Sequence, residues 1–179
     1  MLSANDTVAI IIDVQERLID HMHDADQVKA NAARLIEGCG ILGVPVAFTE
    51  QYPKGLGPTI DELRTLLADC IRFEKQVFSC WRQDDFQRWL VNSERNNVLL
   101  AGIETHVCVS QTAVDLLENG FHVEVVADAV SSRREENREI GLSKMQRRGA
   151  DLTSTEMALF ELLRVAKGDR FKAVSRLVR

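Results

Sequence analysis

The sequence lacks the features that would place it in a membrane, in an exported protein or on a nucleic acid. No apolar run approaches the roughly 18 residues that span a bilayer, and the first residues lack the basic-then-apolar order of a secretory signal. The net charge of −5 disfavours nucleic acid, because such binders concentrate Lys and Arg against phosphates. The basic cluster at 133–148 is interleaved with glutamates, which is typical of a solvated helix face. We therefore expect a cytoplasmic enzyme or binding protein that contacts neither membrane nor nucleic acid.

Cysteine is also scarce, and the cysteines are widely spaced. There are four: Cys39, Cys70, Cys80 and Cys108. Without a CxxC pair or a neighbouring histidine cluster, neither a disulfide framework nor a structural zinc site is expected. Cys39 and Cys70 fall at apolar positions of a predicted helix and strand, so we expect them in the core. Cys80 follows Lys75 closely, and the pattern leaves open whether it lines a pocket or packs in the core.

Strand and helix patterns alternate along the whole chain. The unbroken β-branched run at 7–12 predicts a strand covered on both faces, as in a parallel sheet. Further strands are expected at 44–49, about 70–73, 97–103, 121–127 and 151–153, and helices at 28–39, 59–68, 84–93, 107–118, 135–147, 155–165 and 170–178. This order, without repeats or linkers, predicts a three-layer, doubly wound α/β fold with a mostly parallel, about six-stranded sheet. We expect residues 1–179 to form one domain.

Chemically active residues follow several of these strands. In open α/β sheets, ligands bind beyond the carboxyl ends of the strands, where the strand order reverses. Asp13 follows the first strand, the stretch 49–51 ends the second, Lys75 lies just after the third, and Cys108 follows the fourth. We therefore expect a carboxylate, an ammonium and a thiol to converge.

Cys108 is the most informative of these residues. It lies in the first turn of a predicted helix, where free N–H groups and the helix dipole favour an anion and lower a thiol pKa; a nearby Lys75 would add to this effect. Asp13 could accept the thiol proton and later pass it to a leaving amine. A cysteine near a helix start is also a common small core residue, so position alone leaves both interpretations open.

Three segments resemble the signatures of a known family. They are Ile-Ile-Asp-Val-Gln at 11–15, Phe-Glu-Lys at 73–75 and Ala-Gly-Ile-Glu-Thr-His-Val-Cys-Val at 101–109. Their order and separations resemble those of the isochorismatase-like cysteine hydrolases over essentially the whole chain. The stretch 49–59 and the ending around Phe171 are most similar to the branch of isochorismatase domain-containing proteins.

The resemblance implies a catalytic triad and an activity. In it Asp13 is the base, Lys75 its electrostatic partner and Cys108 the nucleophile. It also implies a cis peptide bond at Ile103–Glu104 that turns the N–H of Glu104 toward that of Cys108, forming an oxyanion hole. The implied reaction is hydrolysis of a C–N bond, in an amide or ureide of a small molecule, through a thioester. A homo-oligomer, dimeric or larger, is implied as well.

The loop after the second strand departs from one branch of the family. Nicotinamidases hold a metal there through an aspartate and two histidines, whereas this loop contains Glu50, Gln51, Tyr52 and Lys54 and no histidine. We therefore expect no metal and no cofactor, and nicotinamide is disfavoured as substrate. Cys108 in turn disfavours the vinyl ether cleavage of isochorismatase proper, which does not rely on this nucleophile.

Several other residues are candidates for contact with the substrate. We expect Gln51 and Tyr52 from this loop, Phe78 and Trp81 as aromatic walls, and Gln15, for which a structural role as a buried amide is an equal alternative. His106 is expected to be a polar turn residue and Asp128 to tie down a loop. The competing function is a catalytically silent family member that acts as a binding or interaction protein. The sequence does not identify the substrate.

Overall fold

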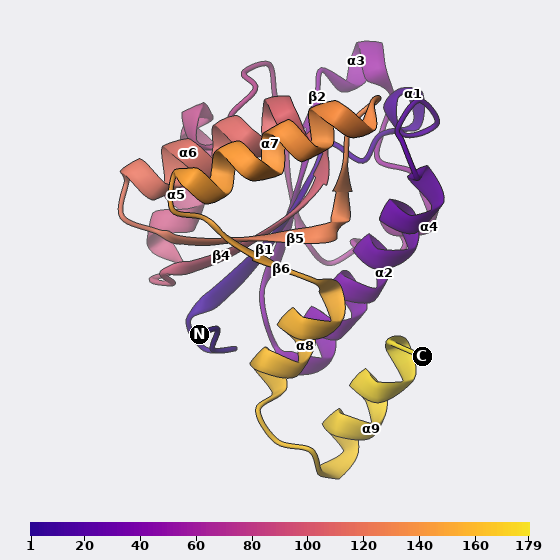
Figure 1. The fold of residues 1–179 in the computed structure, drawn as a ribbon, viewed down its shortest axis with the longest axis vertical. Coiled ribbons are helices and arrows are strands. Elements are labelled where there is room, and N and C mark those ends of the chain that lie inside the picture. Colours follow the sequence, from indigo (N-terminus) through magenta and orange to yellow (C-terminus); the bar gives the residue numbers. More distant parts are fainter.

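A parallel sheet forms the centre of the computed structural model, which describes residues 1–179 (Figure 1). Its strands are β1 (Thr7–Ile12), β2 (Val46–Gln51), β3 (Ile71–Lys75), β4 (Asn97–Ile103), β5 (His122–Ser131) and β6 (Asp151–Thr153). They lie in the order β3-β2-β1-β4-β5-β6, and all neighbours are parallel. The strand order reverses between β1 and β4, which confirms the predicted doubly wound fold.

Helices cover both faces of the sheet, which gives the three layers (Figure 1). One face carries α2 (Ala25–Leu42), α8 (Thr155–Leu163) and α9 (Gly168–Leu177), and the other carries α5 (Asp84–Asn92), α6 (Ser110–Glu118) and α7 (Glu135–Arg147). The connections hold three short helices, α1 (Glu16–Ile19), α3 (Pro53–Leu56) and α4 (Asp61–Arg64), a 3-10 turn at Cys80–Arg82 and a π-helical turn at Thr105–Val109. None of the helices is long and apolar enough to cross a bilayer.

The burial of β1 explains the unbroken apolar run in the sequence. Successive side chains of a strand point to opposite faces. Ile10 and Ile12 accordingly join the core beneath α5, α6 and α7, while Ala9 and Ile11 join the core beneath α2, α8 and α9. All six residues of β1 are buried. This confirms the prediction of a strand covered on both faces.

Among the predicted boundaries that were wrong, those of the fifth strand and of the helix at 59–68 have a clear structural reason. The fifth strand continues to Ser131, beyond the predicted end at 127, because a bulge in the β4–β5 pairing lets Val130 pair with Gly102. The predicted helix at 59–68 contains only the four residues of α4. The buried pair Leu63 and Leu67 has helical spacing, but the chain between them already leaves the helix as turns.

Gly102 allows β4 to pass very close to β1 at the carboxyl edge of the sheet. Its φ is +116°, in the region that favours glycine, and a Cβ placed there would lie 2.1 Å from the carbonyl oxygen of Ile12. The next residue along β1 is Asp13. The close approach of these two strands therefore fixes the backbone from which the Asp13 side chain projects.

We predict that Gly102→Ala lowers the free energy of unfolding by at least about 3 kcal/mol, because the new methyl group meets backbone that cannot move aside and the φ is unfavourable. Gly40→Ala in α2 is the matched control, since a Cβ there meets nothing within 4 Å; it should stabilise the protein by about 0.5–1 kcal/mol. Urea denaturation of both variants measures the difference. Similar stability of the two variants would contradict the close approach.

Candidate active site

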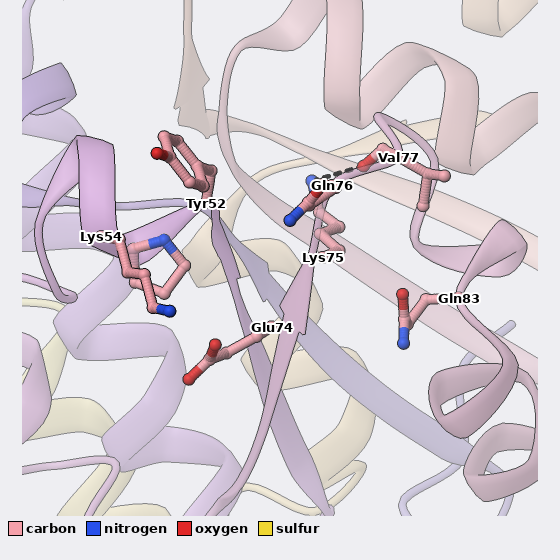
Figure 2. Close-up of a pocket in the computed structure, with 8 residues that line it drawn as sticks. Tyr52, Lys54, Glu74, Lys75, Gln76, Val77 and Gln83 are labelled. Carbon is pink, nitrogen blue, oxygen red and sulfur yellow. Dashed lines mark hydrogen bonds between the residues drawn. The ribbon is translucent and has the colours of Figure 1, made fainter.

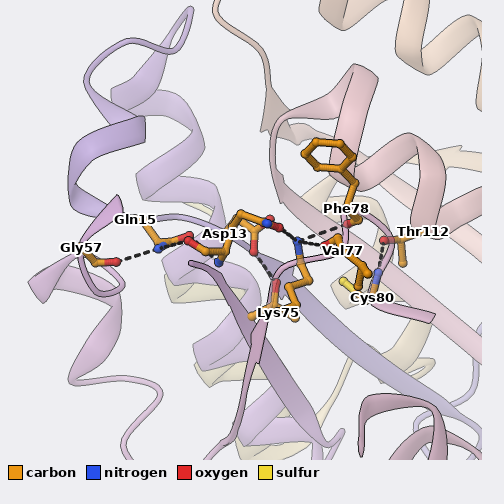
Figure 3. A network of polar contacts seen from close by, with 10 residues as sticks. Asp13, Gln15, Gly57, Lys75, Val77, Phe78, Cys80 and Thr112 are labelled. Carbon is orange, nitrogen blue, oxygen red and sulfur yellow. Dashed lines mark hydrogen bonds and ion pairs between the residues drawn. The ribbon is translucent and has the colours of Figure 1, made fainter. Parts of the chain in front are cut away.

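Asp13 and Lys75 form a buried ion pair at the carboxyl edge of the sheet (Figure 3). The Lys75 Nζ lies 2.6 Å from Oδ2 of Asp13, and the two side chains are 0% and 1% exposed. The other carboxylate oxygen, Oδ1, accepts a hydrogen bond of 2.7 Å from the hydroxyl of Thr49. Asp13 follows β1, Thr49 belongs to β2 and Lys75 ends β3. Three adjacent strand ends therefore hold one carboxylate in a fixed orientation.

The ammonium group of Lys75 is saturated by its neighbours. Besides Asp13, it donates to Oε1 of Gln51 at 2.7 Å and to the carbonyl of Phe78 at 3.2 Å. Burial by itself would lower the pKa of Lys75, but the Asp13 carboxylate outweighs it and holds that pKa above its ordinary value. Lys75 is therefore charged, and its three N–H donors already have partners. Its contact with Oδ2 holds the Asp13 carboxylate in place.

Cys108 lies beside this pair, in the π-helical turn between β4 and α6. Its side chain is buried, with 7% of the residue exposed. Burial raises the pKa of Cys108 to about 12; the charge of Asp13 adds to the rise and Lys75 partly opposes it. The expectation of a lowered pKa for Cys108 was therefore wrong, because the thiol is buried and lies beside the Asp13 carboxylate, which is paired with Lys75. In the resting protein Cys108 is a thiol, and Asp13 is the group placed to accept its proton.

The backbone before Cys108 has an unusual path. The peptide bond between Ile103 and Glu104 is cis. The carbonyl of Glu104 accepts hydrogen bonds from the N–H groups of Val107 at 3.1 Å and Val109 at 3.2 Å. These bonds close the turn on both sides of Cys108 and fix its position relative to the end of β4.

A small cavity of about 140 Å³ opens onto the thiol. It is lined by Asp13, Leu18, Gln51, Leu56, Phe78, Ile103, Glu104, Val107 and Cys108. Most of these residues are apolar. A volume equivalent to roughly four or five water molecules suits a substrate group of a few non-hydrogen atoms.

Two of the predicted contact residues line this cavity, and Gln15 does not. Gln51 and Phe78 belong to its wall. Gln15 is fully buried, and its amide donates to the carbonyls of Gln51 at 3.0 Å and Gly57 at 2.6 Å while accepting from the N–H of Gln51 at 2.8 Å. Gln15 therefore has the structural role that the sequence left open: it is bonded to Gly57 (Figure 3) and positions Gln51, which in turn binds Lys75.

Tyr52 lies outside the small cavity. It lines a wider, polar depression of about 640 Å³, together with Lys54, Glu74 and Gln83 (Figure 2). Lys75 borders this depression and is not part of the lining of the small cavity. Tyr52 is 52% exposed to solvent.

Trp81 and Cys80 belong to the core side of the site. Trp81 packs edge-on against Phe121 with ring centroids 5.4 Å apart. Cys80 is fully buried, its backbone N–H donates to the hydroxyl of Thr112 at 2.9 Å, and burial raises its pKa to about 11, with Lys75 opposing the rise. Of the two alternatives for Cys80, the structure therefore favours packing.

The two polar residues that were expected to be structural do make local contacts. The His106 Nδ1 lies 2.9 Å from the hydroxyl of Ser132, and Asp128 accepts bonds of 2.8 and 2.9 Å from the backbone and hydroxyl of Thr155. No three His, Cys, Asp or Glu side chains gather into an arrangement that could hold a metal.

Sequence reasoning missed three residues of the site. Thr49 was noted only as part of a strand end, although its place beside Asp13 follows from the pairing of β1 with β2. Leu18 and Leu56 come from α1 and α3, two short helices that no periodic pattern announces. Their part in the cavity wall had no signal in the sequence.

The fold and site define a three-layer α/β protein with a cysteine, an aspartate and a lysine gathered at the switch point of its sheet. Residues 7–157 match the isochorismatase domain. The chain belongs to the isochorismatase family.

Relatives match nearly the whole chain. Isochorismatase domain-containing protein 2 of Danio rerio is 39% identical over 178 residues, which cover 99% of this chain and 89% of the relative. The structure is similar to that of the MAR1 ribonuclease from Caenorhabditis elegans, with a TM-score of 0.93, 36% identity and coverage of 99% and 91%. It is also similar to the YcaC gene product of Escherichia coli, described as an octameric hydrolase of unknown specificity, with a TM-score of 0.93, 27% identity and coverage of 98% and 88%.

We predict that Lys75→Met lowers the free energy of unfolding by about 3–5 kcal/mol, because it leaves the Asp13 carboxylate buried without its counterion. The double variant Asp13→Asn with Lys75→Met should lose less than the sum of the single changes, since it removes both charges. Lys172→Met, which breaks an exposed pair with Asp169, is the control and should change nothing measurable. Urea denaturation compares the variants, and an unchanged stability of Lys75→Met would contradict the paired burial.

Proposed function

We propose that this protein hydrolyses a C–N bond in a small amide or ureide, with Cys108 as nucleophile and a thioester as intermediate. The observation that carries the proposal is the buried Asp13–Lys75 ion pair beside the Cys108 thiol, at a cavity of about 140 Å³. A carboxylate held anionic next to a protonated thiol is a general base in contact with its nucleophile.

The first half of the proposed reaction forms the thioester. The Cys108 sulfur attacks the carbonyl carbon as its proton passes to Asp13. The N–H groups of Glu104 and Cys108 are the donors that we assign to the resulting oxyanion. When the intermediate collapses, the C–N bond breaks and Asp13 returns the proton to the leaving nitrogen, which departs as ammonia or an amine.

The second half regenerates the enzyme. A water molecule occupies the place of the departed amine and gives a proton to Asp13 as its oxygen attacks the thioester carbonyl. The C–S bond then breaks, the acid is released and the Cys108 sulfur recovers the proton. Lys75 and Thr49 each bond one oxygen of Asp13 and keep the carboxylate oriented for both proton transfers.

The raised pKa of Cys108 supports proton transfer during attack over a thiolate that exists beforehand. A thiol with a pKa of about 12 is almost wholly protonated near neutrality, so the nucleophile forms only when Asp13 removes the proton. This arrangement protects the cysteine from oxidants and alkylating agents between turnovers, since these react with the thiolate.

The cavity, the net charge of the chain and the acid–base pair favour this function over two alternatives. One relative bears the name ribonuclease; for this chain, a small cavity with acidic and apolar walls and a net charge of −5 favour a small molecule over an RNA strand. A silent binding protein would not need an acid–base pair against the cysteine. We also propose a homo-oligomer, by analogy with the octameric relative.

We predict that Cys108→Ala abolishes release of ammonia from small amides, by at least about 10³-fold, because the cavity lining holds no other thiol, hydroxyl or amine side chain. Cys70→Ser is the control, since this half-buried thiol lies outside the cavity, and it should retain full activity. A coupled ammonia assay on a panel of small amides and ureides measures both. Undiminished turnover in Cys108→Ala would refute the proposed mechanism.

We predict that labelling of Cys108 by iodoacetamide rises steadily from pH 6 to pH 10 without a plateau, because the pKa of the thiol lies near 12. Asp13→Asn should speed labelling near pH 8, since Asp13 raises that pKa and Lys75 then acts on the thiol alone, while the same change abolishes hydrolysis. Peptide mass spectrometry reads the site of labelling. A labelling midpoint near pH 6–7 in the unmodified protein would instead show that Cys108 is already a thiolate in the resting protein.

A further inference from the structure

The polar side chains that line the thiol cavity already have partners within the protein. Both oxygens of the Asp13 carboxylate accept hydrogen bonds from neighbouring side chains, and Oε1 of Gln51 accepts from Lys75. The two carboxylate oxygens of Glu104 lie 2.6 and 3.4 Å from nitrogens of the Arg133 guanidinium. A bound molecule therefore meets mainly the apolar part of the wall.

Five apolar side chains make up that part of the wall. They are Leu18, Leu56, Phe78, Ile103 and Val107. The last two belong to the strand end and the turn that carry the thiol, and Phe78, which is 52% exposed, lies at the rim. A hydrocarbon chain gains free energy on entering such a space, whereas a polar group without a partner pays for its lost hydration.

Leu18 and Leu56 lie on two short helices, α1 and α3, that are tied to each other (Figure 1). The guanidinium of Arg17 in α1 donates to the carbonyl of Gly55 in α3 at 2.7 Å. The residues just before Arg17 make two further hydrogen bonds, of 2.6 and 3.0 Å, to the loop that follows Leu56. This part of the wall therefore resists being pushed outward by a larger ligand.

The volume of the cavity indicates the length of chain that it holds. A space of about 140 Å³ takes four or five groups the size of a water molecule, at roughly 30 Å³ each. The carbonyl carbon and oxygen of a substrate, which must lie beside the Cys108 sulfur, occupy about two of these places. Room remains for about two or three carbon atoms.

We propose that the substrate carries a short, uncharged aliphatic chain of about two or three carbon atoms into this cavity, and that Leu18 and Leu56 set the length of the chain. This inference rests on the proposed function and narrows its amide substrates to those of short fatty acids. A polar atom in the chain would lose its water without gaining a side-chain partner, and a longer chain would press against the tied helices. Leu18 and Leu56 are thereby specificity-determining residues.

Three amides that differ only in their chain test this inference. Butyramide has the expected length, hexanamide is longer, and 3-hydroxypropionamide has a hydroxyl in place of the terminal methyl group of butyramide. The kcat/KM for ammonia release should be at least about tenfold higher for butyramide than for either of the others. A value for hexanamide or 3-hydroxypropionamide that equals or exceeds the value for butyramide would overturn the proposal.

Substitutions of the two leucines test their assignment. Leu18→Ala and Leu56→Ala enlarge the cavity and should each raise the ratio of hexanamide to butyramide turnover at least about fivefold. Leu56→Phe removes space without removing packing, so it tests the assignment even if an alanine variant does not fold; it should slow butyramide turnover and spare that of acetamide.

Leu66→Ala is the matched control. Leu66 is also a half-buried leucine, but it packs against the core beneath α2 and does not line the cavity. It should keep the substrate ratio of the unmodified protein. An equal change in Leu66→Ala and Leu56→Ala would overturn the assignment, because a general loosening of the protein would then explain both.

Binding to Cys108→Ala, which cannot form a thioester, separates this inference from the proposed chemistry. The backbone signals of Leu56 and Val107 in ¹⁵N-labelled protein are followed by NMR as each amide is added. Butyramide should bind at least about fivefold more tightly than 3-hydroxypropionamide and, although hexanamide is the more hydrophobic, than hexanamide.

The two measurements together distinguish the possible failures. If the unmodified protein hydrolyses none of the amides but the order of binding persists, the proposed hydrolysis fails and the preference for a short apolar chain stands. If ammonia is released equally well from all three amides, the hydrolysis stands and the preference is overturned.

Discussion

The ion pair between Asp13 and Lys75 joins the ends of β1 and β3 across β2 in a space without solvent. Burying two charges costs several kcal/mol each, and an apolar pair of similar volume would often serve stability equally well. Under the proposed function its value to the protein therefore lies in chemistry, because it places a carboxylate beside a thiol. Gly102, Thr49 and Gln51 make this possible, the first through a close backbone approach and the other two through hydrogen bonds.

Support for the pair extends well beyond the residues that touch it. The side-chain amide of Gln15 donates to the backbone carbonyl of Gln51 and accepts from its backbone N–H. The side-chain oxygen of Gln51 in turn accepts a hydrogen bond from Lys75. Gln15 also anchors the loop after β2 through Gly57, next to the α3 residue Leu56 that lines the cavity. The orientation of the ammonium and the shape of the cavity wall are thus set by one buried amide.

Much of the fold and the identities of the central residues could be predicted, because both depend on local patterns. The apolar run of β1 indicated a covered strand, and the rule that ligands bind beyond strand ends brought Asp13, Lys75 and Cys108 together. The cavity wall could not be predicted, since Leu18 and Leu56 lie on helices too short for a periodic signal. Trp81 was wrongly expected as a wall because adjacency to Phe78 in sequence says nothing of its packing against Phe121. The pKa of Cys108 depends on burial and on which charge lies nearer, and only the three-dimensional arrangement supplies both.

The strand that carries Lys75 lies at the edge of the sheet and is hydrogen-bonded on one side only. Edge strands are among the first parts of a domain to open. Charged residues on such a strand, here Arg72 and Glu74, disfavour pairing with a strand of another chain. Whenever β3 detaches, Asp13 loses its counterion and the acid–base pair ceases to exist while the rest of the sheet stays intact. In the proposed mechanism the competent site therefore depends on the pairing of one five-residue strand with β2.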